Sequence, residues 1–259
     1  MRRAALIKLA ALLAFAASLG LLPPPWSWLG AAAALAVALA VIVWGVFDVN
    51  SSLWAPTLWR GSGKAVALTF DDGPDPAFTP RVLDILREKG VKAAFFCVGE
   101  RVESAPDLVK RLAGEGHLVC NHSFSHAMWI NFGHYRRLRR EIEQCNASIA
   151  RATGVTPRFY RAPHGFKNSA LGDVLRDLGM TAIGWQVRGF DAVDGDATRI
   201  VRRIVNRARP GGVIALHDGS GLQGTANRRA TIEALPVIID GLKAKGYKLM
   251  RLDELLGTS

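Results

Sequence analysis

The sequence predicts an α/β protein: a small or deformed (β/α) barrel of about seven parallel strands, preceded by an N-terminal transmembrane helical hairpin. Two observations predict this fold. Residues 64–259 alternate short apolar runs with amphipathic helical patterns, as chains do when helices cover a parallel sheet. Residues 1–47 are almost wholly apolar, as membrane-spanning helices are.

The hairpin is expected to contain two helices, at 4–22 and 29–47. Each segment is close to the ~20 apolar residues that a helix needs to cross a bilayer, and Lys8 is the charge within them. Prolines and tryptophans lie between the two segments, which favours a turn at a membrane surface. A cleaved signal peptide over residues 1–20 is the alternative.

Flanking charges predict the orientation of the hairpin. Arg2 and Arg3 precede the first segment, Arg60 and Lys64 follow the second, and the turn between the segments is uncharged. By the positive-inside rule both ends lie in the cytoplasm. Three cysteines without CxxC spacing also suit a reducing compartment. We therefore expect a two-pass protein of a bacterial-type inner membrane with a cytoplasmic barrel, and an extracytoplasmic barrel is the alternative.

Residues 48–63 are expected to form a juxtamembrane linker, because Asn, Ser, Pro and Gly recur there. The chain carries a net charge of +11, and arginines cluster at 136–140 and 199–209. No nucleic-acid-binding motif accompanies this charge, so a nucleic acid is not an expected partner. The clusters are either solvated helix faces or surfaces that attract anionic lipid or a phosphate-bearing substrate.

The elements of the barrel follow from the pattern over 64–259. Apolar runs predict strands at 65–70, 92–98, 117–121, 158–161, 181–187, 212–217 and 247–250. Amphipathic runs predict helices near 79–89, 105–114, 134–152, 168–178, 196–208 and 229–245. The polar motifs of the chain follow several of these strands, at the rim where barrel enzymes assemble their sites.

Two of these motifs supply carboxylates and imidazoles. TFDDGP ends a strand with Asp71 and Asp72, and HSFSH presents His122 and His126 after another strand. Alone, the first string could be a polar turn and the second a surface pair. Together they suit a catalytic metal, because zinc is held there by three N/O ligands with one position left open. The second carboxylate remains available as a base, so the motifs indicate metal-assisted hydrolysis.

Two further motifs also end strands. RAPHG begins with Arg161, whose guanidinium can pair with a carboxylate and fix its orientation. GVIALHD delivers His217, whose usual pKa range allows it to protonate a leaving amine near neutral pH. A structural histidine that caps the strand is the alternative interpretation of His217.

In this order and spacing, TFDDGP, HSFSH, RAPHG and ALHD resemble the NodB-type polysaccharide deacetylases of carbohydrate esterase family 4, over roughly residues 64–256. The resemblance implies hydrolysis of an N-acyl group on an amino sugar. By position it implies Asp71 as general base, Asp72, His122 and His126 as ligands of one divalent metal, His217 as general acid, and Arg161 and Asp191 as catalytic residues that position the base and support the histidine.

The chain departs from the family pattern around the acyl pocket. Ala192 stands where the fourth motif usually has tryptophan, Ala215 where the fifth has leucine, and His164 where the third has an aromatic residue. We expect these residues, with Pro163 and Gly165, to contact substrate. The two alanines would widen the pocket unless a nearby aromatic side chain fills it, so the acyl group need not be acetate.

The expected function is a membrane-anchored, metal-dependent amide hydrolase that removes an N-acyl group from an amino sugar of a lipid-linked or cell-envelope glycan precursor. The expected partners are this sugar and the membrane. Zinc suits the donor set, and cobalt, manganese or nickel could also occupy it. The alternatives are an extracytoplasmic N-deacetylase of peptidoglycan or another exported polysaccharide, and a non-enzymatic glycan binder on a degenerate scaffold.

Overall fold

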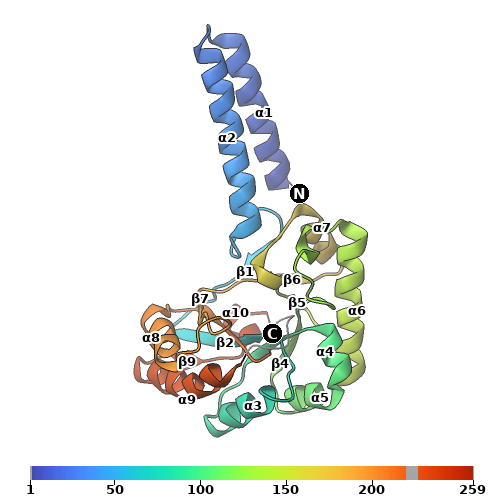
Figure 1. The fold of residues 1–259 in the computed structure, drawn as a ribbon, viewed down its shortest axis with the longest axis vertical. Helices are drawn as coiled ribbons and strands as arrows, with labels where there is room; N and C mark the ends of the chain where they lie inside the picture. The colour runs from blue at the N-terminus through green and yellow to red at the C-terminus, as the bar shows by residue number, and fades with distance from the viewer. Residues whose placement is uncertain (1, 220–226, 259) are drawn as a thin grey trace.

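The computed structural model describes residues 2–219 and 227–258, which form a helical hairpin that projects from an α/β barrel (Figure 1). α1 (Arg2–Leu21) and α2 (Trp26–Phe47) lie side by side and antiparallel. Among the described residues, α2 is the one helix long and apolar enough to cross a membrane. It could serve as an anchor or as a signal sequence. In α1, Leu9–Leu21 is an apolar stretch too short to meet the same criterion, so the criterion does not support the two-pass, cytoplasmic arrangement.

The barrel is one parallel sheet with the strand order β1-β6-β5-β4-β3-β2-β8-β7, in which β9 also pairs with β2. Its strands are β1 (Thr57–Leu58), β2 (Ala65–Asp71), β3 (Ala94–Cys97), β4 (Leu118–Asn121), β5 (Phe159–Tyr160), β6 (Thr181–Ile183), β7 (Val187–Arg188), β8 (Gly212–His217) and β9 (Lys248–Leu249). The six expected strands other than 181–187 are each present as a single strand.

The expected strand at 181–187 is instead two strands, β6 and β7, near opposite edges of the sheet. Residues 184–186 alone connect them, and a connection this short spans at most about 15 Å. The two edges must therefore come together, which curls the sheet into a half-closed barrel. Gly184 donates its N–H to the carbonyl of Leu58, and Gln186 donates to that of Val213, so this connection ties both edges.

The segment expected to be a free linker is bonded into the barrel. β1 pairs with β6, and an isolated bridge joins Arg60 to Gly212. The buried Lys167 Nζ donates to the carbonyl oxygens of Val49 (2.7 Å) and Ser51 (2.5 Å). Residues 48–63 therefore complete the sheet and hold the base of the hairpin against it.

Helices cover the outer face of the sheet (Figure 1). They are α3 (Thr79–Glu88), α4 (Gly99–Ser104), α5 (Pro106–Gly114), α6 (Tyr135–Thr153), α7 (Ser169–Asp177), α8 (Ala197–Arg207) and α9 (Arg229–Ala244). The short α10 (Leu252–Leu256) packs on the inner face, and two 3-10 turns, η1 (Ile130–Phe132) and η2 (Pro163–Gly165), lie in loops. All six expected helices are present within a few residues of their expected bounds, and α4 and α10 are additional.

Alternation along the strands separates two cores. On β8, Ile214 and Leu216 belong to the outer core beneath the helices, whereas Val213 belongs to an inner core. Small residues such as Ala65 and Ala67 and the leucines of α10 fill that inner core. The strand residues that follow on the same inward face are polar, and they form the rim described next.

Candidate active site

The sequence-predicted polar residues come together at the carboxyl ends of the strands. Asp71 ends β2 and is followed by Asp72; His122 follows β4 and begins the loop that carries His126; Arg161 follows β5; Asp191 lies three residues after β7; and His217 ends β8. All of these strands run parallel, so their carboxyl ends meet at one rim. Six of the seven side chains are buried, and His217 is half-buried.

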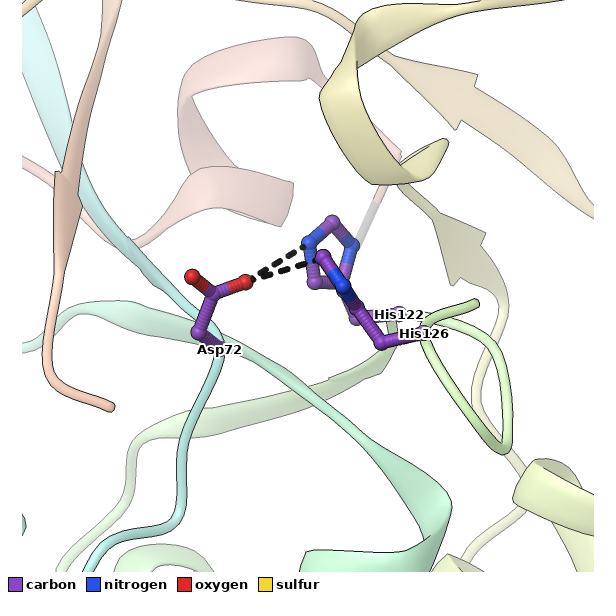
Figure 2. Close-up of side chains that lie close together, drawn as sticks. All are labelled: Asp72, His122 and His126. Atoms are coloured by element: carbon purple, nitrogen blue, oxygen red, sulfur yellow. Dashed lines mark ion pairs between the residues drawn. The ribbon is translucent and has the colours of Figure 1, made fainter. Parts of the chain in front are cut away.

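Asp72, His122 and His126 converge on one point (Figure 2). The Oδ1 atom of Asp72 lies 3.4 Å from Nε2 of His122 and 3.1 Å from Nε2 of His126. One ligand atom from each residue lies within 4.8 Å of the other two. Burial favours the neutral form of Asp72, yet hydrogen bonding with the two imidazoles holds its pKa well below the ordinary value. Asp72 is therefore a carboxylate at neutral pH.

These residues fit a divalent metal. Nδ1 of His122 lies 2.8 Å from the carbonyl oxygen of Arg161, which can only accept, so Nδ1 carries a proton. In the neutral form of the imidazole, Nε2 would present a lone pair towards the Asp72 carboxylate, an arrangement that a cation between the two groups would stabilise. Two imidazole nitrogens and one carboxylate oxygen are donors that catalytic zinc accepts.

The loop that carries the two histidines is held by residues that sequence reasoning missed. Ser123 and His126 adopt positive φ values of 66° and 52°, which are uncommon for residues other than glycine. Glu141 on α6 accepts the N–H groups of residues 124 and 125, and Asn121 Oδ1 accepts that of Ser123 at 2.8 Å. A glutamate on an amphipathic helix normally faces solvent, so no sequence signal marked Glu141.

Arg161 holds the first carboxylate of the motif. Its Nη1 lies 2.6 Å from Oδ1 of Asp71 and 2.7 Å from Oγ1 of Thr69. Nη2 donates to the carbonyl of Gly184 at 3.0 Å, and the guanidinium carbon lies 4.0 Å from the ring centroid of Phe96. Arg161 is fully buried, so the ion pair fixes the orientation of Asp71.

A second acid–imidazole pair lies at the end of β8. Nδ1 of His217 lies 3.0 Å from Oδ1 of Asp191, and the backbone N–H of His217 donates to Oδ2 at 2.8 Å. Thr231 on α9 donates to the same Oδ2 at 2.8 Å. Burial opposes protonation of His217, but the charge and hydrogen bond of Asp191 outweigh it and raise the pKa of His217 to about 9. His217 is therefore an imidazolium at neutral pH, with Nδ1 engaged.

Asp218 is a buried carboxyl group that the sequence-based site did not include, although it follows His217 directly. Its Oδ2 accepts a 2.6 Å hydrogen bond from Thr79, and a Cβ on Gly73 would collide with the carboxylate. Burial, reinforced by the negative charges of Asp72 and Asp71, raises the pKa of Asp218 to about 7. This group lies beneath the turn that follows Asp72.

The expected substrate-contact residues occupy different environments. Pro163, His164 and Gly165 form η2, where exposed His164 lies 5.0 Å from His126 between ring centroids. Ala215 is buried on β8, whereas Ala192 is exposed on the loop after β7.

Phe190, one of the aromatic side chains near the altered fourth motif, is engaged by two arginines. Its ring centroid lies 4.0 Å from the guanidinium carbon of Arg188 and 5.1 Å from that of Arg203. Phe190 remains 38% exposed. It is therefore a partly open side chain next to Asp191 and does not belong to the buried core.

The chain is similar to known deacetylases in sequence. The profile of the polysaccharide deacetylase family matches residues 60–183. A peptidoglycan-N-acetylglucosamine deacetylase of Bacillus cereus is 37% identical over 201 residues, which cover 75% of this chain and 69% of that protein. A chitooligosaccharide deacetylase of Sinorhizobium fredii is 34% identical over 75% of this chain and 93% of its own length.

The fold is similar to solved structures of the same kind. The crystal structure of the Bc1960 peptidoglycan N-acetylglucosamine deacetylase matches with a TM-score of 0.74 and 32% identity, over 78% of this chain and 94% of that one. A carbohydrate esterase family 4 pseudoenzyme from Bacillus anthracis matches with a TM-score of 0.71 and 26% identity, over 78% and 69% of the two chains.

Sequence identity, fold and the clustering of four motifs at one rim agree. The chain therefore belongs to the polysaccharide deacetylase family, the NodB type of carbohydrate esterase family 4, and is a carbohydrate N-deacetylase that hydrolyses carbon–nitrogen bonds.

Proposed function

We propose that the protein is a membrane-anchored, metal-dependent deacylase that removes an N-acyl group from an amino sugar of a lipid-linked or cell-envelope glycan precursor. The observation that carries the chemical part is the buried convergence of Asp72, His122 and His126 beside the Asp71–Arg161 pair. This arrangement offers a cation site and a proton acceptor on consecutive residues.

In this proposal each side chain has one task. Asp72, His122 and His126 would hold a divalent ion, which would supply Lewis acidity to an amide carbonyl and to water. Asp71, oriented by Arg161 at 2.6 Å, accepts the proton of the attacking water. His217, kept protonated by Asp191, donates a proton to the departing amine, so that carboxylate and free amino sugar are released.

The anchorage part of the proposal rests on α2 and its junction with the barrel. α2 is long and apolar enough to cross a membrane, and hydrogen bonds join residues 49–51 to Lys167 and Trp185. Because these hydrogen bonds hold the barrel at the end of α2, the active site would stay near the bilayer. A substrate carried on a lipid would remain within its reach.

An extracytoplasmic peptidoglycan or exported-polysaccharide deacetylase is the second candidate, favoured by the names of the relatives. A reporter fused to the C-terminus, active in one compartment only, would separate the two candidates. Mass spectrometry of lipid-linked sugars in a deletion strain gives an independent test. The lipid-linked proposal requires that a species heavier by one acyl group accumulates, and a change confined to polymeric glycan would contradict it.

The catalytic proposal is tested with Asp71→Asn in the full chain. The variant should retain bound metal but lose acetate release from an N-acetylated oligosaccharide, whereas His126→Ala should lose both. Asp107→Asn, at an exposed carboxylate on α5, is the matched control and should behave as the wild type. Full activity of Asp71→Asn would overturn the assigned role of the base.

A further inference from the structure

A group of exposed apolar side chains lies between the hairpin and the active site. We call this group the apolar rim. It consists of Met128 and Trp129, which precede η1, and Phe132, which ends η1, all in the loop before α6. Trp129 is 67% exposed, Met128 49% and Phe132 44%. None of the roles proposed above uses them, and three large apolar side chains exposed together favour a contact surface.

The apolar rim is continuous with the end of α2. Phe47, the last residue of α2, lies 5.1 Å from Phe166 between ring centroids. Phe166 lies 5.7 Å from Phe132, and Phe132 lies 5.6 Å from Trp129. α2 is the candidate anchor, so the aromatic contacts extend from the barrel-side end of this anchor across the surface of the barrel.

The same series of ring contacts also reaches Asp72, His122 and His126, which we call the metal-ligand cluster. His164 lies 6.0 Å from Phe166 and 5.0 Å from His126, again between ring centroids. The apolar rim therefore borders the active site on the side that faces the hairpin.

The fold fixes the exposure of the apolar rim. Ile130 and Asn131, between Trp129 and Phe132, are buried. Asn131 Nδ2 donates to the carbonyl of Pro163 at 2.8 Å, which joins the loop to η2. A polar side chain thus faces inward while its aromatic neighbours face outward, so the outward position does not result from a loose loop.

Positive charge follows the apolar rim directly. Arg136 and Arg137, in the first turn of α6, are exposed. Tryptophan and phenylalanine next to exposed arginines suit the boundary of an anionic bilayer, where rings enter the headgroup layer and guanidinium groups meet phosphates.

We propose that the apolar rim inserts into the surface of the same membrane that α2 enters, so that the active site opens at the lipid headgroups. This inference rests on the proposed anchorage by α2 and adds a second contact with the bilayer. It selects amphiphilic N-acyl sugars, whose headgroup would reach the metal-ligand cluster without leaving the membrane surface.

Site-directed spin labelling of the full chain in phosphatidylcholine–phosphatidylglycerol vesicles tests the inference. Cys97, Cys120 and Cys145 are buried, so a nitroxide reagent should react at an introduced cysteine. Trp129→Cys reports on the apolar rim, and Val37→Cys reports on α2. Val155→Cys, an exposed position beyond the far end of α6, is the aqueous control.

The expected result is a loss of collisions with a water-soluble nickel chelate, and a gain with oxygen, at positions 129 and 37 but not at 155. Nickel access at 129 equal to that at 155, with 37 protected, would overturn the inference and leave the anchorage intact. Nickel access at all three positions would overturn both. Dipolar broadening between labels at 129 would assign the apolar rim to contact with a second copy of the chain, and this outcome would also overturn the inference.

Discussion

At the scale of single residues, the two titratable pairs of the site have opposite characters. Asp71 is paired with a permanently charged guanidinium, whereas His217 owes its charge to the carboxylate of Asp191. In the proposed mechanism, the first pair orients the proton acceptor and the second keeps the proton donor charged. Arg161 would therefore favour the role of base for Asp71, and Asp191 would favour the role of acid for His217.

The His217–Asp191 pair predicts the alkaline limb of the pH profile. His217 must be protonated to act as the acid, and its pKa is raised to about 9. The rate should therefore stay constant up to about pH 9 and fall at higher pH. Asp191→Asn removes the charge and leaves burial dominant, so the pKa of His217 should fall below ~6.5 and the alkaline limb should move to lower pH.

The measurement is kcat/KM against pH for the wild type and for Asp191→Asn. Asp194 lies in the same loop as Asp191, and Asp194→Asn, which removes its ion pairs with Arg199 and Arg203 on α8, is the control and should leave the alkaline limb in place. An unchanged limb in Asp191→Asn would show that the limb reports another group.

At the scale of elements, α6 supports the metal-ligand cluster without contributing a ligand. Glu141 bonds to the backbone of the loop between His122 and His126. Groups that orient metal ligands typically contribute 10–100-fold to affinity, so Glu141→Ala should weaken zinc binding by about that factor. Competition with a chromophoric chelator measures it, and Glu143→Ala, at a surface ion pair of the same helix, should have no effect.

The junction between α2 and the barrel depends on one buried ammonium group. Lys167 Nζ bonds to two carbonyl oxygens and to Thr57 Oγ1, and burial lowers its pKa to about 8. Lys167→Met removes the ammonium donor of the Val49 carbonyl and leaves the Ser51 carbonyl with the 3.2 Å hydrogen bond from Thr57, and a buried acceptor left unpaired costs about 1–3 kcal/mol. We expect a lower melting temperature and faster proteolysis within residues 48–56.

Lys245→Met is the matched control, because this lysine also donates to a carbonyl oxygen but at the surface. If the Lys167 and Lys245 variants melt and are cleaved alike, the junction does not depend on the buried lysine.

At the scale of the whole molecule, periodic signals were enough to predict the barrel, its six main helices and the rim at which the motifs meet. Elements that lack a period of their own could not be predicted. β1 has two residues, and its pairing with β6 depends on contacts made more than a hundred residues away. Residues 181–187 are mostly apolar, so nothing in their sequence indicated that the chain passes from one edge of the sheet to the other at residues 184–186.

Supporting residues of the site were missed for a related reason. Glu141 and Thr231 are ordinary helix residues by sequence, and each acts through a tertiary hydrogen bond. The residues that meet at the rim could be predicted because strong polar motifs mark them at strand ends. Their partners lie inside regular elements, where no motif is visible.

Metal binding should stabilise the whole barrel. The ion would relieve repulsion among buried donors that come from β2 and the loop after β4, so zinc should raise the melting temperature and a chelator should reverse the change. Saturation at a hundred times Kd corresponds to about 2.7 kcal/mol of unfolding free energy. His126→Ala should remove the response, and magnesium, which prefers oxygen donors, should not produce it. A zinc response that persists in His126→Ala would place the ion elsewhere.

The three-residue connection between β6 and β7 links the closure of the barrel to the active site. Gly184 begins this connection: its N–H donates to Leu58 on β1, its carbonyl accepts from Arg161, and Arg161 in turn holds Asp71. The closure of the barrel and the orientation of Asp71 therefore both involve Gly184. If the connection between β6 and β7 loses its hydrogen bonds, the protein should lose activity while its helices remain folded. The enzymatic rate and the circular dichroism signal, measured together at low denaturant concentrations, would therefore report whether the barrel is closed.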